Sequence, residues 1–177
     1  MVSKLPRGVK AALYADDLVL WYKEEHASTA IDQLTAWTED WCVTVNKDTF
    51  STSLFTLSPK KQARPIKIGT HTLKEEDQAT YLGVIFDKRL TWKTHTLRTE
   101  GKARKKLAIM RKLAGTTVYE GSVRPVLEYS STSWSTTAKT KQHSLDKIQN
   151  QALRIITGAM KSTPITFMEQ TAAIQPL

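Results

Sequence analysis

Two short apolar stretches, residues 11–15 and 18–21, flank a single acidic pair, Asp16-Asp17. Stretches this short that meet at turn-forming aspartates are typical of two buried strands joined by a tight turn. The pattern therefore predicts a hairpin with both carboxylates at its tip. Adjacent carboxylates on a rigid turn are hard oxygen ligands that suit Mg²⁺ and a bound triphosphate. The alternative is a polar turn without chemistry, although such turns usually contain Gly or Asn, and this one contains neither.

The rest of the first half is predicted to form short strands around one amphipathic helix. Apolar residues recur at three- and four-residue steps between Thr29 and Trp41, and Thr29 with Asp32 suggests a capping box at the start of this helix. Trp41 and the single cysteine, Cys42, are expected in the core. One cysteine excludes an intrachain disulfide and a cysteine-built zinc site. Further strands are predicted at 43–45, 52–57, 66–68 and 81–86, with turns at 46–48, 69–71 and 87–89.

The pattern becomes helical after Trp92 and stays helical. One helix is predicted over 93–113, with Leu97, Leu107, Met110 and Leu113 buried and Gly115 at its end. Others are predicted over 118–129 with a kink or break at Pro125, over 144–157 with Gly158 at its end, and after Thr163-Pro164. The fold class is therefore α+β, with a mixed part over 1–92 and an all-helical part over 93–177.

The chain is strongly basic. Its 26 Lys and Arg against 17 Asp and Glu give a net charge of +9, which favours an anionic partner such as nucleic acid or an acidic membrane surface. The predicted helix over 93–113 carries one acid, Glu100, and eight cations, more than solubility requires: Lys93, Arg98, Lys102, Arg104, Lys105, Lys106, Arg111 and Lys112. No apolar run approaches the length of a membrane span, so we expect an intracellular protein, in the nucleus or the cytoplasm.

Tyr14-Ala15-Asp16-Asp17 resembles the Tyr-x-Asp-Asp box of reverse transcriptases, in which Ala at the variable position is typical of non-LTR, LINE-like elements. The helix that ends near Trp41, followed by Asn46, resembles the palm segment after the catalytic hairpin of this family. Tyr81-Leu82-Gly83-Val84, with Asp87, Leu90 and Trp92, resembles the strand and turn that grip the primer end. Two later segments, 123–129 with Trp134 and 149–154, resemble the helical region that follows the palm in jockey-like elements.

This resemblance implies an RNA-directed DNA polymerase that transfers nucleotides by a two-metal mechanism, with Mg²⁺, an RNA template, a DNA primer and dNTPs. Asp16 would be a metal ligand and Asp17 its partner, both catalytic. Tyr14 would back the hairpin near the primer end, while the primer 3′ terminus would be positioned by Tyr81, Leu82 and Gly83. Residues 1–92 would be the C-terminal part of the palm. Residues 93–177 would be the thumb and connection, whose basic helix follows the duplex backbone.

Several features depart from the family pattern. The other metal-binding Asp and the fingers lie upstream of the hairpin in this family, whereas only residues 1–9 precede it here. We therefore expect weak Mg²⁺ binding and no polymerase activity from this chain alone. Lys47-Asp48-Thr49 differs from the usual Lys followed by Thr or Ser, and 114–119 is short. The alternatives are a non-catalytic nucleic-acid-binding remnant of a degenerate element and a product with no stable fold.

Overall fold

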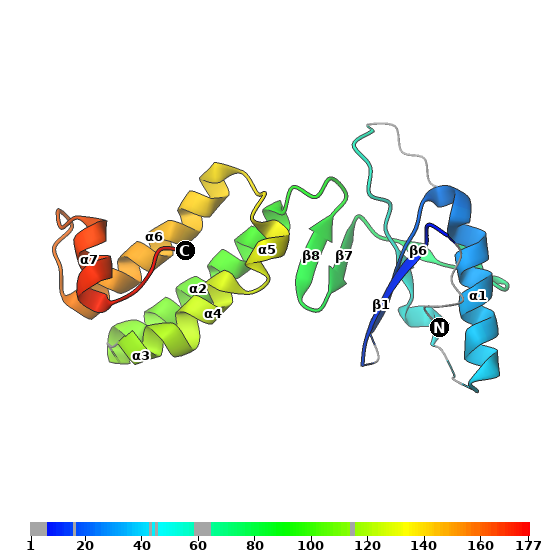
Figure 1. Cartoon of the computed structure of the whole chain (residues 1–177), viewed down its shortest axis with the longest axis horizontal. Helices are drawn as coiled ribbons and strands as arrows, with labels where there is room; N and C mark the ends of the chain where they lie inside the picture. The colour runs from blue at the N-terminus through cyan, green and yellow to red at the C-terminus, as the bar shows by residue number, and fades with distance from the viewer. Residues whose placement is uncertain (1–6, 16, 43, 45, 59–64, 114–115) are drawn as a thin grey trace. The chain divides into compact units, whose positions relative to one another are not determined.

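The structure is a computed structural model that describes residues 7–15, 17–42, 44, 46–58, 65–113 and 116–177. The chain divides into two compact units, Met1–Leu90 and Thr91–Leu177. Among the described residues, the first unit contains helices and strands and the second contains helices only (Figure 1). The predicted α+β class is therefore confirmed. No helix among these residues is long and apolar enough to cross a bilayer.

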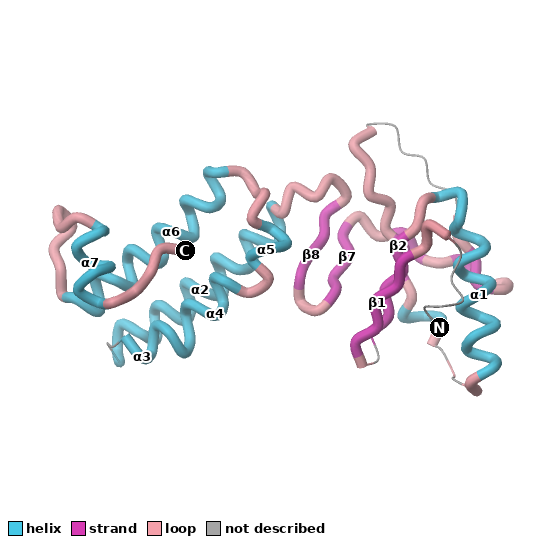
Figure 2. The backbone as a smooth tube through the Cα atoms, viewed as in Figure 1, coloured by secondary structure: helices cyan, strands magenta, loops and turns pink. Residues whose placement is uncertain are grey.

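The first unit opens with the predicted hairpin. Strands β1 (Lys10–Tyr14) and β2 (Asp17–Trp21) pair antiparallel, with Lys10 opposite Trp21 and Tyr14 opposite Asp17 (Figure 2). The expectation that these strands are buried is wrong, because Leu13, Tyr14 and Trp21 are all exposed. The physical reason is that β1 and β2 form a sheet of two strands, which has too few neighbours among the described residues to cover both faces.

Helix α1 (Ala27–Asp40) confirms the predicted amphipathic helix and follows a short turn, η2 (Glu24–His26). Its buried residue Ile31 packs with Ile68 and Leu73. Ile68 ends β4 (Lys67–Ile68), which forms a hairpin with β5 (His71–Thr72), and Leu73 directly follows β5. The capping box is wrong, because His26 occupies the N-cap position and makes no side-chain cap bond. Trp41, which is 69% exposed, and Cys42 are also not core residues, because both lie beyond the end of the helix.

The remaining strands are shorter than predicted. The predicted strand over 52–57 is reduced to β3 (Ser51–Thr52), which pairs in parallel with β6 (Lys74–Glu75). Before β3, the predicted turn at 46–48 is a helical turn, η3 (Lys47–Thr49), in which Asn46 Oδ1 accepts a hydrogen bond from the Asp48 amide at 3.1 Å. The predicted strand over 43–45 falls largely on residues outside the described ones.

The single strand predicted over 81–86 is wrong. The structure has two antiparallel strands there, β7 (Gln78–Tyr81) and β8 (Val84–Asp87), joined by the two-residue turn Leu82-Gly83. Both turn residues have positive φ, 46° for Leu82 and 78° for Gly83. Two-residue hairpin turns need this backbone conformation because it matches the twist of the strands, and glycine adopts it without steric cost.

The second unit is built on α2 (Lys93–Leu113), whose bounds are as predicted. Its buried face includes His95, Thr96, Thr99 and Ala103 with Leu107 and Met110, whereas Leu97 and Leu113 are exposed, so half of the predicted apolar face is wrong. The side chains buried against the neighbouring helices set this face, and three of them are polar. The helix end predicted at Gly115 lies outside the described residues.

The other helices of this unit pack around α2. Helix α3 (Thr116–Val118) is followed directly by the π-helical turn η4 (Tyr119–Val123) and by α4 (Arg124–Glu128). The backbone stays helical at Pro125, and the irregularity there is the π-helical turn that precedes it. A short helix, α5 (Ser131–Trp134), leads to α6 (Lys139–Thr157), which begins earlier than predicted and ends at Gly158 as predicted, with φ 64°. Helix α7 (Ile165–Ala172) follows Pro164, which stands at the N-cap position and not in the first turn.

Candidate catalytic hairpin and nucleic-acid interface

The tip of the first hairpin carries one described carboxylate. The register places Asp17 at the start of β2, directly opposite Tyr14, so that Ala15 and Asp16 are the two residues between the strands. Ala15 has φ 51°, the left-handed conformation that two-residue turns require. Tyr14 is 66% exposed and Asp17 is exposed as well. Asp16, the predicted metal ligand, lies outside the described residues.

The predicted Mg²⁺ site is incomplete within the described part of the chain. No group of three or more His, Cys, Asp or Glu side chains that could hold a metal ion occurs there. The Asp17 carboxylate fits Mg²⁺ in kind, because this ion prefers oxygen ligands. A single carboxylate leaves most of the octahedral shell of Mg²⁺ to water, so by itself it would hold the ion only weakly.

The second predicted motif, Tyr81-Leu82-Gly83, forms the turn end of the β7–β8 hairpin, where Leu82 and Gly83 are exposed. The Tyr81 ring meets the Trp21 ring edge-on, with centroids 6.2 Å apart and planes at 87°. Trp21 lies at the end of β2 remote from Asp17, about 13 Å along the strand. Tyr81 therefore contacts the first hairpin through Trp21, a residue that was not singled out from the sequence. The contact does not bring Tyr81 to Asp17.

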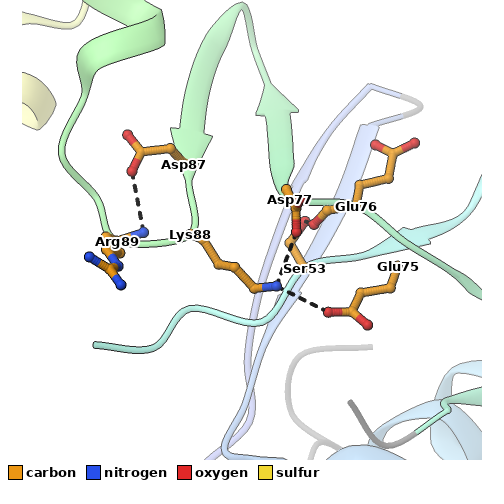
Figure 3. A network of polar contacts seen from close by, with 7 residues as sticks. All are labelled: Ser53, Glu75, Glu76, Asp77, Asp87, Lys88 and Arg89. Carbon is orange, nitrogen blue, oxygen red and sulfur yellow. Dashed lines mark hydrogen bonds and ion pairs between the residues drawn. The ribbon is translucent and has the colours of Figure 1, made fainter. Parts of the chain in front are cut away.

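The open end of the same hairpin holds a cluster of charged residues (Figure 3). The Lys88 ammonium nitrogen lies 3.0 Å from Asp77 Oδ1 and 3.3 Å from Glu75 Oε1. The hydrogen bond to Asp77 is the main cause that raises the pKa of Lys88 above its ordinary value, and Glu75 adds to this effect against partial desolvation. Of these residues, only Lys88 falls in a segment singled out from the sequence, the turn predicted at 87–89.

The cations of α2 fall on two sides of the helix. Arg98, Lys102, Lys105 and Lys112 recur at steps of four, three and seven residues, which places them on one side, and all four are exposed. We call these four residues the basic row. They make no ion pair within the described part of the chain. Their charges are therefore available to an anionic partner.

The other side of α2 carries Lys93, Arg104 and Arg111, also exposed, together with Glu100. Arg104 Nη2 lies 2.7 Å from Glu100 Oε1. This contact is the main cause that lowers the pKa of Glu100, and Ser144 and Lys141 of α6 contribute in the same direction. The cations on this side are thus partly neutralised within the protein. Lys106, the eighth cation, is half-buried.

The positive charge of the chain is concentrated in the second unit. Residues 91–177 contain 14 Lys and Arg against 5 Asp and Glu, whereas residues 1–90 contain 12 of each. The entire net charge of +9 therefore belongs to the helical unit. Counting charges on each side of residue 90 would have revealed this division from the sequence alone.

Comparison with known proteins gives matches to polymerases of mobile elements. The chain is 30% identical over 170 residues to the "Probable RNA-directed DNA polymerase from transposon BS" of Drosophila melanogaster, across 86% of this chain and 19% of the relative. It is 27% identical over 167 residues to the "Probable RNA-directed DNA polymerase from transposon X-element" of the same species. It is 23% identical over 168 residues to the "RNA-directed DNA polymerase from mobile element jockey", also from Drosophila melanogaster.

The chain belongs to the jockey-like reverse transcriptases of non-LTR retrotransposons. It spans about a fifth of the length of the curated relatives that it matches. No family model matches this sequence. No solved structure matches it either. In this reverse transcriptase segment, the two motifs behind the family resemblance form the turns of two hairpins in one unit, and the basic row lies in the other unit.

Proposed function

We propose that this chain supplies the aspartate-bearing palm hairpin and a nucleic-acid-binding thumb helix to a polymerase that copies RNA into DNA. The observation that carries the proposal is the antiparallel β1–β2 pairing, which leaves Asp17 exposed beside a two-residue turn. Asp16 and Asp17 would offer carboxylate oxygens to Mg²⁺, and Tyr14 opposite Asp17 would back the primer end. When bound, Mg²⁺ would stabilise the attacking 3′ oxygen and the leaving pyrophosphate.

The partner that we propose for the second unit is an RNA–DNA duplex formed by template and primer. The basic row extends over 15 residues of a regular helix, from Arg98 to Lys112, which corresponds to a rise of about 21 Å. This length matches about six phosphates of one strand measured along a duplex axis. We assign phosphate contact to the basic row in preference to Lys93, Arg104 and Arg111, because Glu100 partly neutralises that side.

We further propose that this chain alone does not polymerise. The two adjacent carboxylates of one hairpin, Asp16 and Asp17, would not suffice to hold two Mg²⁺ ions, and further ligands would have to come from other parts of a polymerase. We expect no templated incorporation in a primer-extension assay with Mg²⁺, an RNA template and a DNA primer, although the chain still binds the primer–template. Incorporation that is lost in Asp16→Asn and Asp17→Asn would contradict this expectation.

The concentration of the net charge in residues 91–177 favours a second candidate function, a non-catalytic nucleic-acid-binding remnant. A chimera separates the two candidates, with this chain in place of the matching segment of the jockey polymerase. A functional palm segment predicts a chimera that extends primers and loses this activity on Asp16→Asn. A remnant predicts a chimera that binds primer–template with salt-sensitive affinity, unaffected by Asp16→Asn, and extends nothing.

A further inference from the structure

The β7–β8 hairpin that carries Tyr81-Leu82-Gly83 is too small to be rigid by itself. Each strand has four residues, and the two strands form a sheet of their own. Isolated two-stranded hairpins of this size are marginally stable in water. Contacts with the rest of the first unit must therefore orient the turn: Val84 and Ile85 are buried, Phe86 meets the Phe55 ring edge-on, and each end of the hairpin makes a further contact. At the turn end this contact is the aromatic pair of Tyr81 with Trp21.

Lys88 provides the contacts at the open end. The outermost ladder pair is Gln78 with Asp87, so the next residues outward, Asp77 and Lys88, face each other across the strands. Opposite charges at such positions stabilise a hairpin. Lys88 Nζ lies 3.0 Å from Asp77 Oδ1 at this position, and the Lys88 side chain is only 24% exposed. The ion pair therefore closes the hairpin where the ladder ends.

The same lysine connects the hairpin to two other segments of the first unit. Its ammonium group also reaches Glu75 Oε1 at 3.3 Å, and Glu75 belongs to β6, which pairs with β3 (Figure 3). The Lys88 carbonyl oxygen accepts a hydrogen bond from the Thr56 amide at 3.1 Å. Since β3 and β6 have only two residues each, Lys88 adds cross-links where strand pairing is sparse.

We propose that Lys88 is a positioning residue, which orients the Tyr81-Leu82-Gly83 turn by anchoring the open end of its hairpin to Asp77 and Glu75. The anchored turn presents Leu82, at its exposed tip, to the 3′ end of a primer. This role rests on the proposed function, because it requires a nucleic acid at the turn. Lys88 itself is remote from the turn, at the opposite end of a four-residue ladder.

Two measurements on the full chain test this role. Amide hydrogen exchange reports how firmly the β7–β8 ladder is held, with α2 as an internal reference. A diazirine amino acid at position 82 reports contact with the primer 3′ end, by photo-crosslinking at a saturating concentration of RNA–DNA primer–template. The variants are Lys88→Met, which removes the charge, and Lys88→Arg, which keeps it. Lys74→Met is the matched control, because Lys74 is 78% exposed and pairs with Glu76 at 3.1 Å.

We expect Lys88→Met to speed amide exchange in the β7–β8 ladder roughly threefold to tenfold, because it removes two charge contacts. Crosslinking from position 82 should decrease by a similar factor. Exchange in α2 and duplex affinity should stay within about twofold of wild type, and Lys88→Arg and Lys74→Met should resemble wild type in both measurements. If Lys88→Met leaves ladder exchange unchanged, or leaves crosslinking unchanged despite faster exchange, only the role of Lys88 is overturned. A wild-type chain that binds duplex without crosslinking overturns the primer role of the turn as well. A wild-type chain that binds no duplex overturns the proposed function.

Discussion

His95 is a titratable side chain packed inside the helical unit. It is 4% exposed, and its ring lies 6.1 Å from the ring of Trp134. Burial is the main cause that lowers the pKa of His95, and the nearby cations Arg98 and Lys102 lower it further. Both effects disfavour the imidazolium form, because a buried positive charge loses hydration and is repelled by the two cations. The folded unit therefore favours the neutral form of His95.

The lowered pKa has a defined consequence for stability. The unfolded chain takes up a proton at position 95 near pH 6.5, while the folded chain resists protonation until a lower pH. The contribution of His95 is therefore fully present above pH 6.5 and declines as the pH falls from there through the folded-state pKa. We expect the free energy of unfolding, measured by urea denaturation from pH 7.5 to pH 5, to decrease with this profile.

Two variants check that His95 is the source of this pH dependence. His95→Gln removes the titrating group, so it should flatten the pH profile between 5 and 7.5 even if it lowers stability at pH 7.5. His143→Gln, at an exposed position of α6, should leave the wild-type profile in place. A profile that is equally steep in His95→Gln and in wild type would assign the pH dependence to other groups.

At the scale of single elements, α2 contains a glycine that the fold does not require. Gly101 lies in the helix interior on the exposed side, and no heavy atom lies within 4 Å of a Cβ added there. Gly101→Ala should therefore raise the free energy of unfolding by about 0.5–1 kcal/mol, because alanine has less backbone freedom to lose. Thermal or urea denaturation measures the change.

Gly158 is the matched control for this substitution. It ends α6 with φ 64°, a conformation that alanine adopts only with strain. The change from Gly to Ala at this position should lower stability by about 1 kcal/mol, which is opposite in sign to the effect at Gly101. A loss of stability in Gly101→Ala would show that the glycine has a structural role in α2 that its surroundings do not reveal.

The elements were predictable where local sequence alone decides them. The turn of the first hairpin, the start of α2 and the stop at Gly158 follow from apolar spacing, turn residues and helix formers. The division of the 81–86 strand was missed, because Leu82 takes a left-handed conformation that its residue type disfavours. The buried face of α2 was half wrong, because packing on other helices buries His95 and threonines that count as polar in any sequence pattern.

The candidate site was predictable as a set of residues but not as a geometry. The contacts of Trp21 with Tyr81 and of Lys88 with Glu75 join residues that are far apart in the sequence, and no local pattern encodes them. The eight cations of α2 were visible in the sequence, but their separation into the basic row and the Glu100 side depends on helix geometry and on α6. The roles given to Asp16, Asp17 and Tyr14 remain predictions.

At the scale of the whole molecule, charge and sequence motifs are divided unequally between the two units. The first unit has as many acids as cations and carries both motif turns, while the second carries the whole net charge of +9. A basic surface on one unit binds nucleic acid mainly through phosphates, so its affinity falls with salt. We therefore propose, as the central point for this chain, that the basic row of α2 contacts the backbone of an RNA–DNA duplex.

Fluorescence anisotropy titrations of a labelled RNA–DNA hybrid at several salt concentrations test this claim most directly. They compare Lys102, Lys105 and Lys112 changed together to Gln with a control in which Lys93, Arg104 and Arg111 are changed together to Gln. Each variant removes three positive charges from α2. Loss of three phosphate contacts should reduce the slope of log affinity against log salt by about 2.7 in the basic-row variant, and the control should change it by less than about 1. Equal losses in the two variants, or wild-type affinity that does not depend on salt, would contradict the claim.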